Sequence, residues 1–384
     1  MPRVLNSIED LRQRARRQIP RAIFEYADQG AYDELTYRRN RSDLEAFEFR
    51  QRVLRDVSHT SLATTMLGEP ASFPLAIGPT GLTGLFHRNG EMEGALAAEA
   101  FGIPFTLSTM SICSIEDVRS VTKKPFWFQL YVMRDRGFTA ELIERAAAAS
   151  CSALMLTVDM PIQGLRRRDA KNGLSIPPRL TLRNAWEIAR RPAWLGGVLF
   201  GRRRTFGNLE ARLRNSGGLT TLAQWIGTQF DLTGTWRDIA WVRERWPGKL
   251  LLKGVMDPQD AREAVAAGVD AIVVSNHGGR QLDGASSTIA ALPGVVDAVA
   301  GRTEVHFDGG IRSGQDLLKA LALGARGGFI GKAFLYGLAA EGRTGVTRAL
   351  TILRDELAVS MALTGCRDVR DIDATILRDR VTLP

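Results

Sequence analysis

The sequence is poor in the residues that hold disulfide-rich or metal-binding proteins together. Its 384 residues include three cysteines and four histidines. Cys113, Cys151 and Cys366 lie far apart and show no CxxC or CxH spacing. This pattern argues against a disulfide framework, a zinc site or a redox-active cysteine pair. We predict that the protein binds no metal and that each cysteine is a small buried residue.

Long apolar stretches are also missing. No segment reaches the roughly 18 apolar residues of a membrane span. The basic N-terminal segment, residues 1–20, has no continuous apolar core of the kind that a signal peptide has. We therefore expect a soluble or peripheral protein in the cytoplasm. No nucleic-acid-binding motif accompanies the basic residues, so we expect no nucleic-acid partner.

The apolar residues that are present suffice for a large core. Hydrophobic residues make up 45% of the chain and charged residues 24%, which suits one compact domain spanning 1–384. The net charge is +9, from 51 basic and 42 acidic residues. Residues 166–204 alone hold eleven basic and two acidic residues, an excess equal to that of the whole chain. This segment needs its own explanation.

Eight short apolar runs are typical of buried parallel strands. They span residues 74–79, 103–108, 125–131, 153–159, 249–254, 271–276, 304–310 and 327–332. Alanine- and leucine-rich stretches of helical periodicity lie between most of them. Alternating strands and helices imply parallel pairing with right-handed crossovers. We predict an α/β fold, the (β/α)8 TIM barrel, with the chemistry at the C-terminal ends of the strands.

Three segments lie outside this alternation. Residues 1–70 are expected to form an N-terminal helical cap, with one helix from Ser7 to Arg17 and a second ending at Gly30. Residues 347–365 are expected to form a final amphipathic helix. Nearly ninety residues separate the fourth and fifth strands. This predicts a long insertion at about 165–245.

The strongest chemical signal is SNHGGRQLD, residues 275–283, which follows the sixth apolar run. His277 and Arg280 can point into one barrel mouth, and the glycines allow close approach of a ligand. Histidine suits proton abstraction near neutral pH, and the arginine fork matches a carboxylate. The alternative is a surface turn with an incidental HxxR pattern.

Two glycine-rich strand exits in tandem, residues 306–314 and 324–334, predict a phosphate site. Each leads into a helix N-terminus, where backbone N–H groups and the helix dipole bind anions, and Arg312 and Lys332 add positive charge. Lys253 ends a strand that is otherwise mostly leucine. Burying its charge there would be costly without an anionic or electron-rich partner, such as a reduced cofactor or a barrel acid.

Polar residues also alternate along the third and fourth predicted strands. Gln129 and Tyr131 share one face, as do Thr157 and Asp159. Both pairs would face the barrel mouth or interior. Taken alone, either pair could be a set of satisfied core polar groups.

At this point the sequence resembles the FMN-dependent 2-hydroxy-acid dehydrogenase and oxidase family. The motifs that carry the resemblance are EYADQGAYDELT, GPTGLTG, FTLSTMS, FQLYV, TVDMP, SNHGGRQLDG and DGGIRSGQDLLKALALGA. The match runs essentially end to end. It looks closest to bacterial L-lactate dehydrogenases, with features similar to L-mandelate dehydrogenases.

The resemblance implies FMN as cofactor and assigns site residues. Catalysis would involve His277, Asp159, Tyr131, Arg280 and Lys253, and the substrate would contact Tyr26, Tyr131, Arg166, His277 and Arg280. The implied FMN-binding residues are Pro79, Thr80, Gly81, Ser108, Gln129, Thr157, Lys253, Ser275, Asp308, Gly309, Gly310, Arg312, Gly331 and Lys332.

Two positions depart from common family patterns. Lys332 stands where many members have arginine, which would replace a bidentate phosphate contact by a point charge. Gly81 stands where many members have alanine and matches the mandelate dehydrogenase pattern. The resemblance therefore leaves the electron acceptor open between quinone, a protein and oxygen.

The basic insertion pairs arginine clusters with large apolar side chains, namely Trp186, Trp194, Leu195, Val198, Leu199 and Phe200. This combination is typical of a segment that lies in an anionic membrane interface. The resemblance supports membrane attachment of residues 180–205 at the inner face of the cell membrane, and a homotetramer. Oligomer contacts or a solvated loop are the alternatives for the segment.

The expected reaction is the oxidation of an L-2-hydroxy acid, with L-lactate to pyruvate favoured over mandelate or another substrate. His277 would be the base, and Arg280 with Arg166 would bind the carboxylate. Hydride and carbanion mechanisms need the same base. The competing hypotheses are another FMN-barrel enzyme, such as an isomerase, and a catalytically silent membrane-associated scaffold.

Overall fold

The computed structural model describes residues 4–173, 182–210 and 229–378. Eight strands form one parallel sheet in the order β3-β10-β9-β8-β7-β6-β5-β4. A further bridge between Ile77 and Phe105 joins the two ends, so the sheet closes almost completely into a barrel. The strands are β3 (Leu75–Ile77), β4 (Thr106–Ser108), β5 (Trp127–Leu130), β6 (Ala153–Thr157), β7 (Lys249–Val255), β8 (Ala271–Val274), β9 (Glu304–Asp308) and β10 (Gly327–Ile330).

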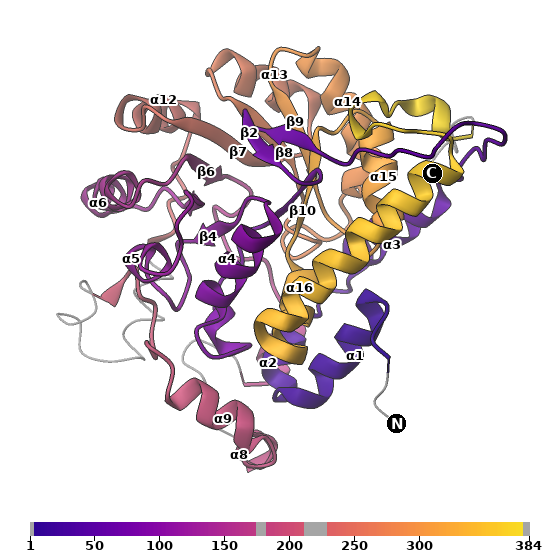
Figure 1. Cartoon of the computed structure of the whole chain (residues 1–384). Coiled ribbons are helices and arrows are strands. Elements are labelled where there is room, and N and C mark those ends of the chain that lie inside the picture. The colour runs from indigo at the N-terminus through magenta and orange to yellow at the C-terminus, as the bar shows by residue number, and fades with distance from the viewer. Residues whose placement is uncertain (1–3, 174–181, 211–228, 379–384) are drawn as a thin grey trace.

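Each of the eight predicted runs contains one of these strands or most of it, which confirms the TIM-barrel prediction. Helices surround the barrel on its outside (Figure 1). They are α4 (Gly90–Phe101), α5 (Ile115–Arg119), α6 (Arg136–Ala148), α12 (Trp236–Arg245), α13 (Pro258–Ala266), α14 (Thr288–Val299), α15 (Gly314–Ala322) and α16 (Lys332–Leu363), with the short 3₁₀ turn η1 (Thr83–Leu85) ahead of α4. Several begin at a capping side chain, such as Ser313, whose hydroxyl accepts the Asp316 N–H.

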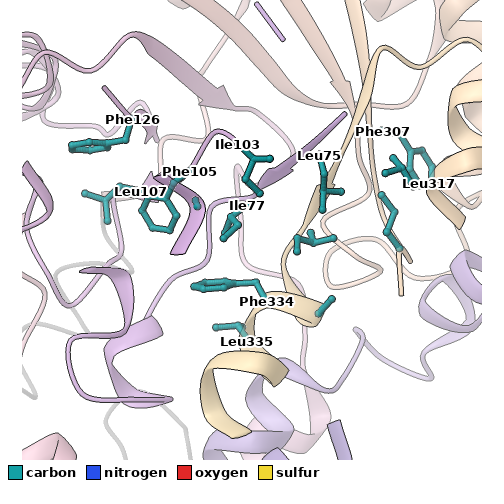
Figure 2. Close-up of a cluster of buried hydrophobic side chains, with 14 of the residues drawn as sticks. Leu75, Ile77, Ile103, Phe105, Leu107, Phe126, Phe307, Leu317, Phe334 and Leu335 are labelled. Atoms are coloured by element: carbon teal, nitrogen blue, oxygen red, sulfur yellow. The ribbon is translucent and has the colours of Figure 1, made fainter. Parts of the chain in front are cut away.

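The core between barrel and helices is made of aromatic and branched side chains. Figure 2 shows Ile77, Phe105 and Phe334 close together, where strand residues meet the first turn of α16. The rings of Phe105 and Phe334 are 6.3 Å apart in an edge-to-face arrangement. Burying each such side chain contributes roughly 1.5–3 kcal/mol. The barrel wall is therefore a firm support for groups at its rim.

The N-terminal segment contains α1 (Ile8–Gln18), α2 (Arg21–Ala27) and α3 (Leu35–Ala46), followed by a hairpin of β1 (Thr64–Met66) and β2 (Glu69–Ala71). The Ser7 hydroxyl caps α1, as predicted. The second helix ends at Ala27 rather than at Gly30. Beyond it the chain turns tightly against the barrel loops: a Cβ at Gly30 would lie 2.9 Å from the Gly279 carbonyl oxygen.

The predicted final helix corresponds to the second of two helical stretches in α16, which ends at Leu363 and is separated from the first by non-helical backbone at Glu341 and Gly342. Gly342 has φ +62°, and a Cβ there would lie 2.7 Å from His87 Nε2. α16 packs beside α1 and α4 on the outside of the barrel (Figure 1). The three cysteines are unpaired, and Cys366 is half-buried rather than buried.

The insertion after β6 contains α7 (Arg167–Lys171), α8 (Leu182–Ala189) and α9 (Pro192–Leu199) ahead of α12. α8 and α9 extend away from the barrel (Figure 1). Trp194 anchors α9, because its indole N–H donates to the Leu85 carbonyl oxygen (2.7 Å). Within the described residues, no helix is long and apolar enough to cross a membrane.

Candidate active site

A cavity of about 610 Å³ opens at the C-terminal ends of the barrel strands. The expected residues that line it are Tyr26, Pro79, Thr80, Gly81, Ser108, Tyr131, Arg166, Lys253, His277, Arg280, Asp308, Gly309, Gly310, Arg312, Gly331 and Lys332. The other expected residues, Gln129, Thr157, Asp159 and Ser275, contact these side chains or neighbour them in the sheet. The fold thus brings the residues of the strand exits together.

His277 is held in a fixed orientation beside Asp159. Its Nδ1 lies 3.0 Å from Asp159 Oδ1, and its backbone N–H donates to the Ser275 hydroxyl (3.1 Å). His277 has φ +58°, and the glycines that follow it also have positive φ. Such backbone strain is stored where the surroundings impose it, often at functional sites. Gly254, with φ +110°, leaves no room for a side chain, since its Cβ would meet that of Asp159 at 2.6 Å.

Burial and nearby charges set the protonation of this pair. Burial lowers the pKa of His277, Asp159 opposes that effect, and the positive charges of Lys253 and Arg166 lower the pKa further. Burial would raise the pKa of Asp159, but His277 and Lys253 outweigh it and leave the pKa lowered. Burial also raises the pKa of Tyr131, and the charge of Asp159 adds to this. At neutral pH the site therefore holds a neutral imidazole, an ionised carboxylate and a neutral phenol.

Arg280, in the loop that follows β8, packs against α2. Its guanidinium group stacks 5.0 Å from the Tyr26 ring centroid and donates to the Tyr26 and Gln29 carbonyl oxygens. Burial, then the charge of Arg166, lowers the pKa of Arg280 to about 10. Arg166 Nε is buried and has no hydrogen-bond partner among the described residues. Two guanidinium groups close together in one cavity wall indicate an anionic ligand.

Lys253 belongs to a compact polar network. Its ammonium group donates to the Ser275 hydroxyl (2.9 Å) and lies 3.0 Å from Asp308 Oδ2, which also accepts the Ser275 hydroxyl (2.7 Å). Burial would lower the pKa of Lys253, but the charges of Asp308 and Asp159 raise it. Asp308 is therefore the barrel acid that the sequence offered as an alternative partner for Lys253. Lys253 still lines the cavity while it is paired.

The polar atoms in the barrel mouth fit a flavin. Gln129 Oε1 accepts hydrogen bonds from the Ser108 hydroxyl (3.0 Å) and the Thr109 N–H (3.3 Å). Gln129 Nε2 and the Thr157 hydroxyl are buried and have no partner among the described residues. Buried polar groups are rarely left unpaired. A ring with a polar edge, such as the isoalloxazine of FMN, would satisfy both.

The far end of the cavity fits a phosphate. Gly309 and Gly310 have φ +132° and +93°, and Gly331 precedes the N-terminus of the long helix α16. Arg312 and Lys332 line this end. Burial, then the charges of Arg280 and Arg312, lowers the pKa of Lys332 well below its usual value. Such a cluster of cations needs an anion.

Sequence reasoning missed several residues of the cavity wall. Tyr37 accepts a hydrogen bond from Arg312 at its hydroxyl oxygen (2.7 Å), and Lys332 Nζ lies 4.8 Å from its ring centroid. Met110 bounds the space beside Gly81, since a Cβ at Gly81 would lie 3.3 Å from the Met110 Cβ. Asp169, also in the wall, is an acid within a basic run. That isolated negative charge was the one sequence feature that could have marked Asp169 as a residue of the cavity wall.

Comparison with known proteins shows which family the chain is similar to. A family model described as FMN-dependent dehydrogenase matches residues 15–379. An L-lactate dehydrogenase of Caulobacter vibrioides (strain NA1000 / CB15N) is 48% identical, over 98% of this chain and 99% of its own. One of Acinetobacter baylyi (strain ATCC 33305 / BD413 / ADP1) is 46% identical, over 97% of each.

Solved structures with a similar fold come from the same kind of enzyme. The monotopic membrane protein (S)-mandelate dehydrogenase is similar with a TM-score of 0.94 and 36% identity, covering 98% of this chain and 100% of that one. A soluble mutant of the membrane-associated (S)-mandelate dehydrogenase from Pseudomonas putida gives a TM-score of 0.83 and 36% identity with the same coverage. The chain therefore belongs to the FMN-dependent dehydrogenase family and is an FMN-dependent oxidoreductase that acts on 2-hydroxy acids.

Proposed function

We propose that the protein oxidises L-lactate to pyruvate, with His277 as base and Arg280 with Arg166 as the carboxylate-binding pair. The observation that carries the proposal is the meeting of the His277–Asp159 pair and both arginines on one cavity. Lactate is favoured because relatives named L-lactate dehydrogenase match 97–98% of the chain at 46–48% identity.

The proposed roles follow from the charges. Arg280 and Arg166 hold the substrate carboxylate, which orients the hydroxyl-bearing carbon toward His277. Because Nδ1 of His277 is paired with Asp159, Nε2 is the nitrogen that takes the substrate proton. Asp159 then stabilises the imidazolium ion, and Lys253 stabilises negative charge that develops beside it. FMN, when bound, supplies the two-electron acceptor for this oxidation.

The direct test is anaerobic mixing of the yellow purified protein with L-lactate. We expect the flavin colour to bleach, and to bleach with a higher kcat/KM than L-mandelate gives. An isomerase would stay yellow with either acid, and a silent scaffold would carry no colour. Faster bleaching by L-mandelate would instead support the second candidate substrate. The solved mandelate dehydrogenases and Gly81 are the observations that favour it.

We further propose that residues 180–205, which include α8 and α9, contact the inner face of the cell membrane, where a quinone or another acceptor takes the electrons. Trp186 and Phe200 are 64% and 72% exposed. Arg190 lies 5.8 Å from the Trp186 ring centroid, so positive charge accompanies the exposed apolar surface. A solved relative is titled a monotopic membrane protein. A homotetramer, implied by the family, completes the proposal.

Replacing both Trp186 and Phe200 with glutamate tests the membrane contact. Each aromatic side chain is worth roughly 1.5–3 kcal/mol on burial, so we expect co-sedimentation with anionic phospholipid vesicles to fall at least about tenfold. The FMN content should stay unchanged. Leu363→Glu, at a 56% exposed residue of α16, is the matched control. Equal vesicle binding by the double variant and the wild type would contradict the proposal.

A further inference from the structure

Asp169 is an acid in an otherwise cationic part of the cavity wall. It lies in the first turn of α7, three residues after Arg166, in the sequence RRRDAK. It is 8% exposed and lines the cavity. Among the described lining residues the other acid is Asp308, which pairs with Lys253. Asp169 is therefore the carboxylate available to the two arginines before a substrate binds.

A buried hydrogen bond joins Asp169 to the segment that follows α2. The Gln29 side-chain amide donates to Asp169 Oδ1, and Gln29 is completely buried. The backbone of the same segment holds Arg280, whose guanidinium group donates to the Tyr26 and Gln29 carbonyl oxygens. One short segment thus holds Arg280 through its carbonyl groups and α7 through the Gln29 side chain.

The charges around Asp169 agree with this placement. Burial raises the pKa of Asp169, and the positive charges of Arg280 and Arg166 oppose the rise. Its carboxylate in turn opposes the loss of the proton from Arg280. The two guanidinium groups repel each other, and a fixed anion beside them reduces that repulsion.

We propose that Asp169 is a positioning residue of the carboxylate site: through its hydrogen bond with Gln29 it fixes the first turn of α7, and with it Arg166, beside Arg280. The inference rests on the proposed function, since it presumes that these arginines bind the substrate carboxylate. Asp169 does not take part in the chemistry. Its effect falls on substrate affinity, because it sets the spacing of the two arginines.

A neighbouring ion pair on α7 provides a matched control. Arg167 pairs with Asp33, which belongs to the N-terminal segment. Both side chains are more than half exposed, at 55% and 66%, and neither lines the cavity. Asp33→Asn therefore weakens the docking of α7 at the surface without touching the arginine site.

The test compares Asp169→Ala, Asp169→Asn and Asp33→Asn in the FMN-loaded protein. Oxalate is the probe, because it presents a carboxylate but has no hydroxyl-bearing carbon with a hydrogen to lose, and its binding is followed through the flavin absorbance. Loss of one charged hydrogen bond corresponds to roughly a tenfold change. We expect Asp169→Ala to raise the Kd for oxalate and the KM for L-lactate about tenfold or more, with kcat within about threefold.

Rescue by the conservative variant separates positioning from a general structural defect. In Asp169→Asn the negative charge is lost, but the side-chain amide oxygen can still accept the Gln29 hydrogen bond, so the Kd should rise clearly less than in Asp169→Ala. Asp33→Asn should stay within about twofold. Gln29→Met removes the same hydrogen bond from the other side, and we expect it to match Asp169→Ala. If Asp169→Ala fails to retain FMN, Gln29→Met is measured in its place.

The proposal is overturned if oxalate binds Asp169→Ala or Gln29→Met as tightly as the wild type. It is also overturned if Asp169→Asn is as defective as Asp169→Ala, or if Asp33→Asn is equally impaired. Oxalate binding needs no turnover. A wild-type flavin that L-lactate fails to bleach would therefore contradict the proposed substrate, and the oxalate result would still decide the role of Asp169.

Discussion

Replacing His277 with asparagine is expected to slow the reduction of bound FMN by L-lactate roughly 10²- to 10⁴-fold, the usual contribution of a general base. Asparagine is the replacement of choice because His277 has φ +58°, and asparagine tolerates this left-handed backbone better than most residues. Its amide cannot accept the substrate proton. The flavin absorbance spectrum should remain, since the polar groups that fit the flavin lie on other strands.

The pH profile gives a second measurement on the same variant. Burial lowers the pKa of His277 from 6.5, so the imidazole stays neutral as the pH falls through 6.5 and gains its proton only below that value. The wild-type kcat/KM, which reports groups of the free enzyme, should therefore have an acid limb below pH 6.5. In His277→Asn this limb should disappear from the residual rate.

A matched control is His59→Asn, at an exposed histidine outside the cavity, which should leave both the rate and the pH profile unchanged. Rapid-mixing absorbance measurements under anaerobic conditions distinguish the variants. If His277→Asn bleaches at the wild-type rate, another group is the base and the assignment is wrong.

Arg280→Lys is expected to raise the KM for L-lactate roughly 10- to 150-fold, which corresponds to the 1.5–3 kcal/mol of a hydrogen bond to a charged group. Lysine keeps the positive charge but loses the planar fork that matches a carboxylate. It also loses the stacking of the guanidinium group on Tyr26. Competitive inhibition by oxalate should weaken by a similar factor, since oxalate needs the same contact.

Arg262→Lys on α13 serves as the control, because Arg262 is exposed and contacts Gln259 on its own helix. Its KM should match that of the wild type. An unchanged KM in Arg280→Lys, together with unchanged inhibition by oxalate, would show that the carboxylate binds elsewhere. Steady-state kinetics at several lactate concentrations provide the measurement.

The barrel could be predicted because its strands are local patterns. A strand buried on both faces is a short continuous apolar run, and runs such as 153–159 and 271–276 coincide with β6 and β8. The glycine-rich exits were equally visible, because close approach and positive φ require glycine at Gly309 and Gly310. In a parallel barrel the C-terminal strand ends share one rim, so residues on different strands could be expected to meet there.

Helix ends and long-range contacts could not be predicted in the same way. The second helix ends at Ala27 because the following turn must fit against the Gly279 loop, which comes from a distant strand exit. At the kink in α16, a side chain at Gly342 would clash with His87, which is also far away in the sequence. In both cases the deciding contact is tertiary, and local propensity carries no information about it.

The sequence by itself determined the barrel, the order of its strands and the residues at its C-terminal rim, because each depends on short-range periodicity or on glycine at a fixed position. Only the tertiary structure decided which side chains from outside the barrel complete the cavity. Tyr37 and Asp169 enter it because α3 packs against α14 and α15, and α7 packs against α2. The pairing of Asp169 with Gln29 spans 140 residues of sequence, and folding alone brings those two groups within hydrogen-bonding distance.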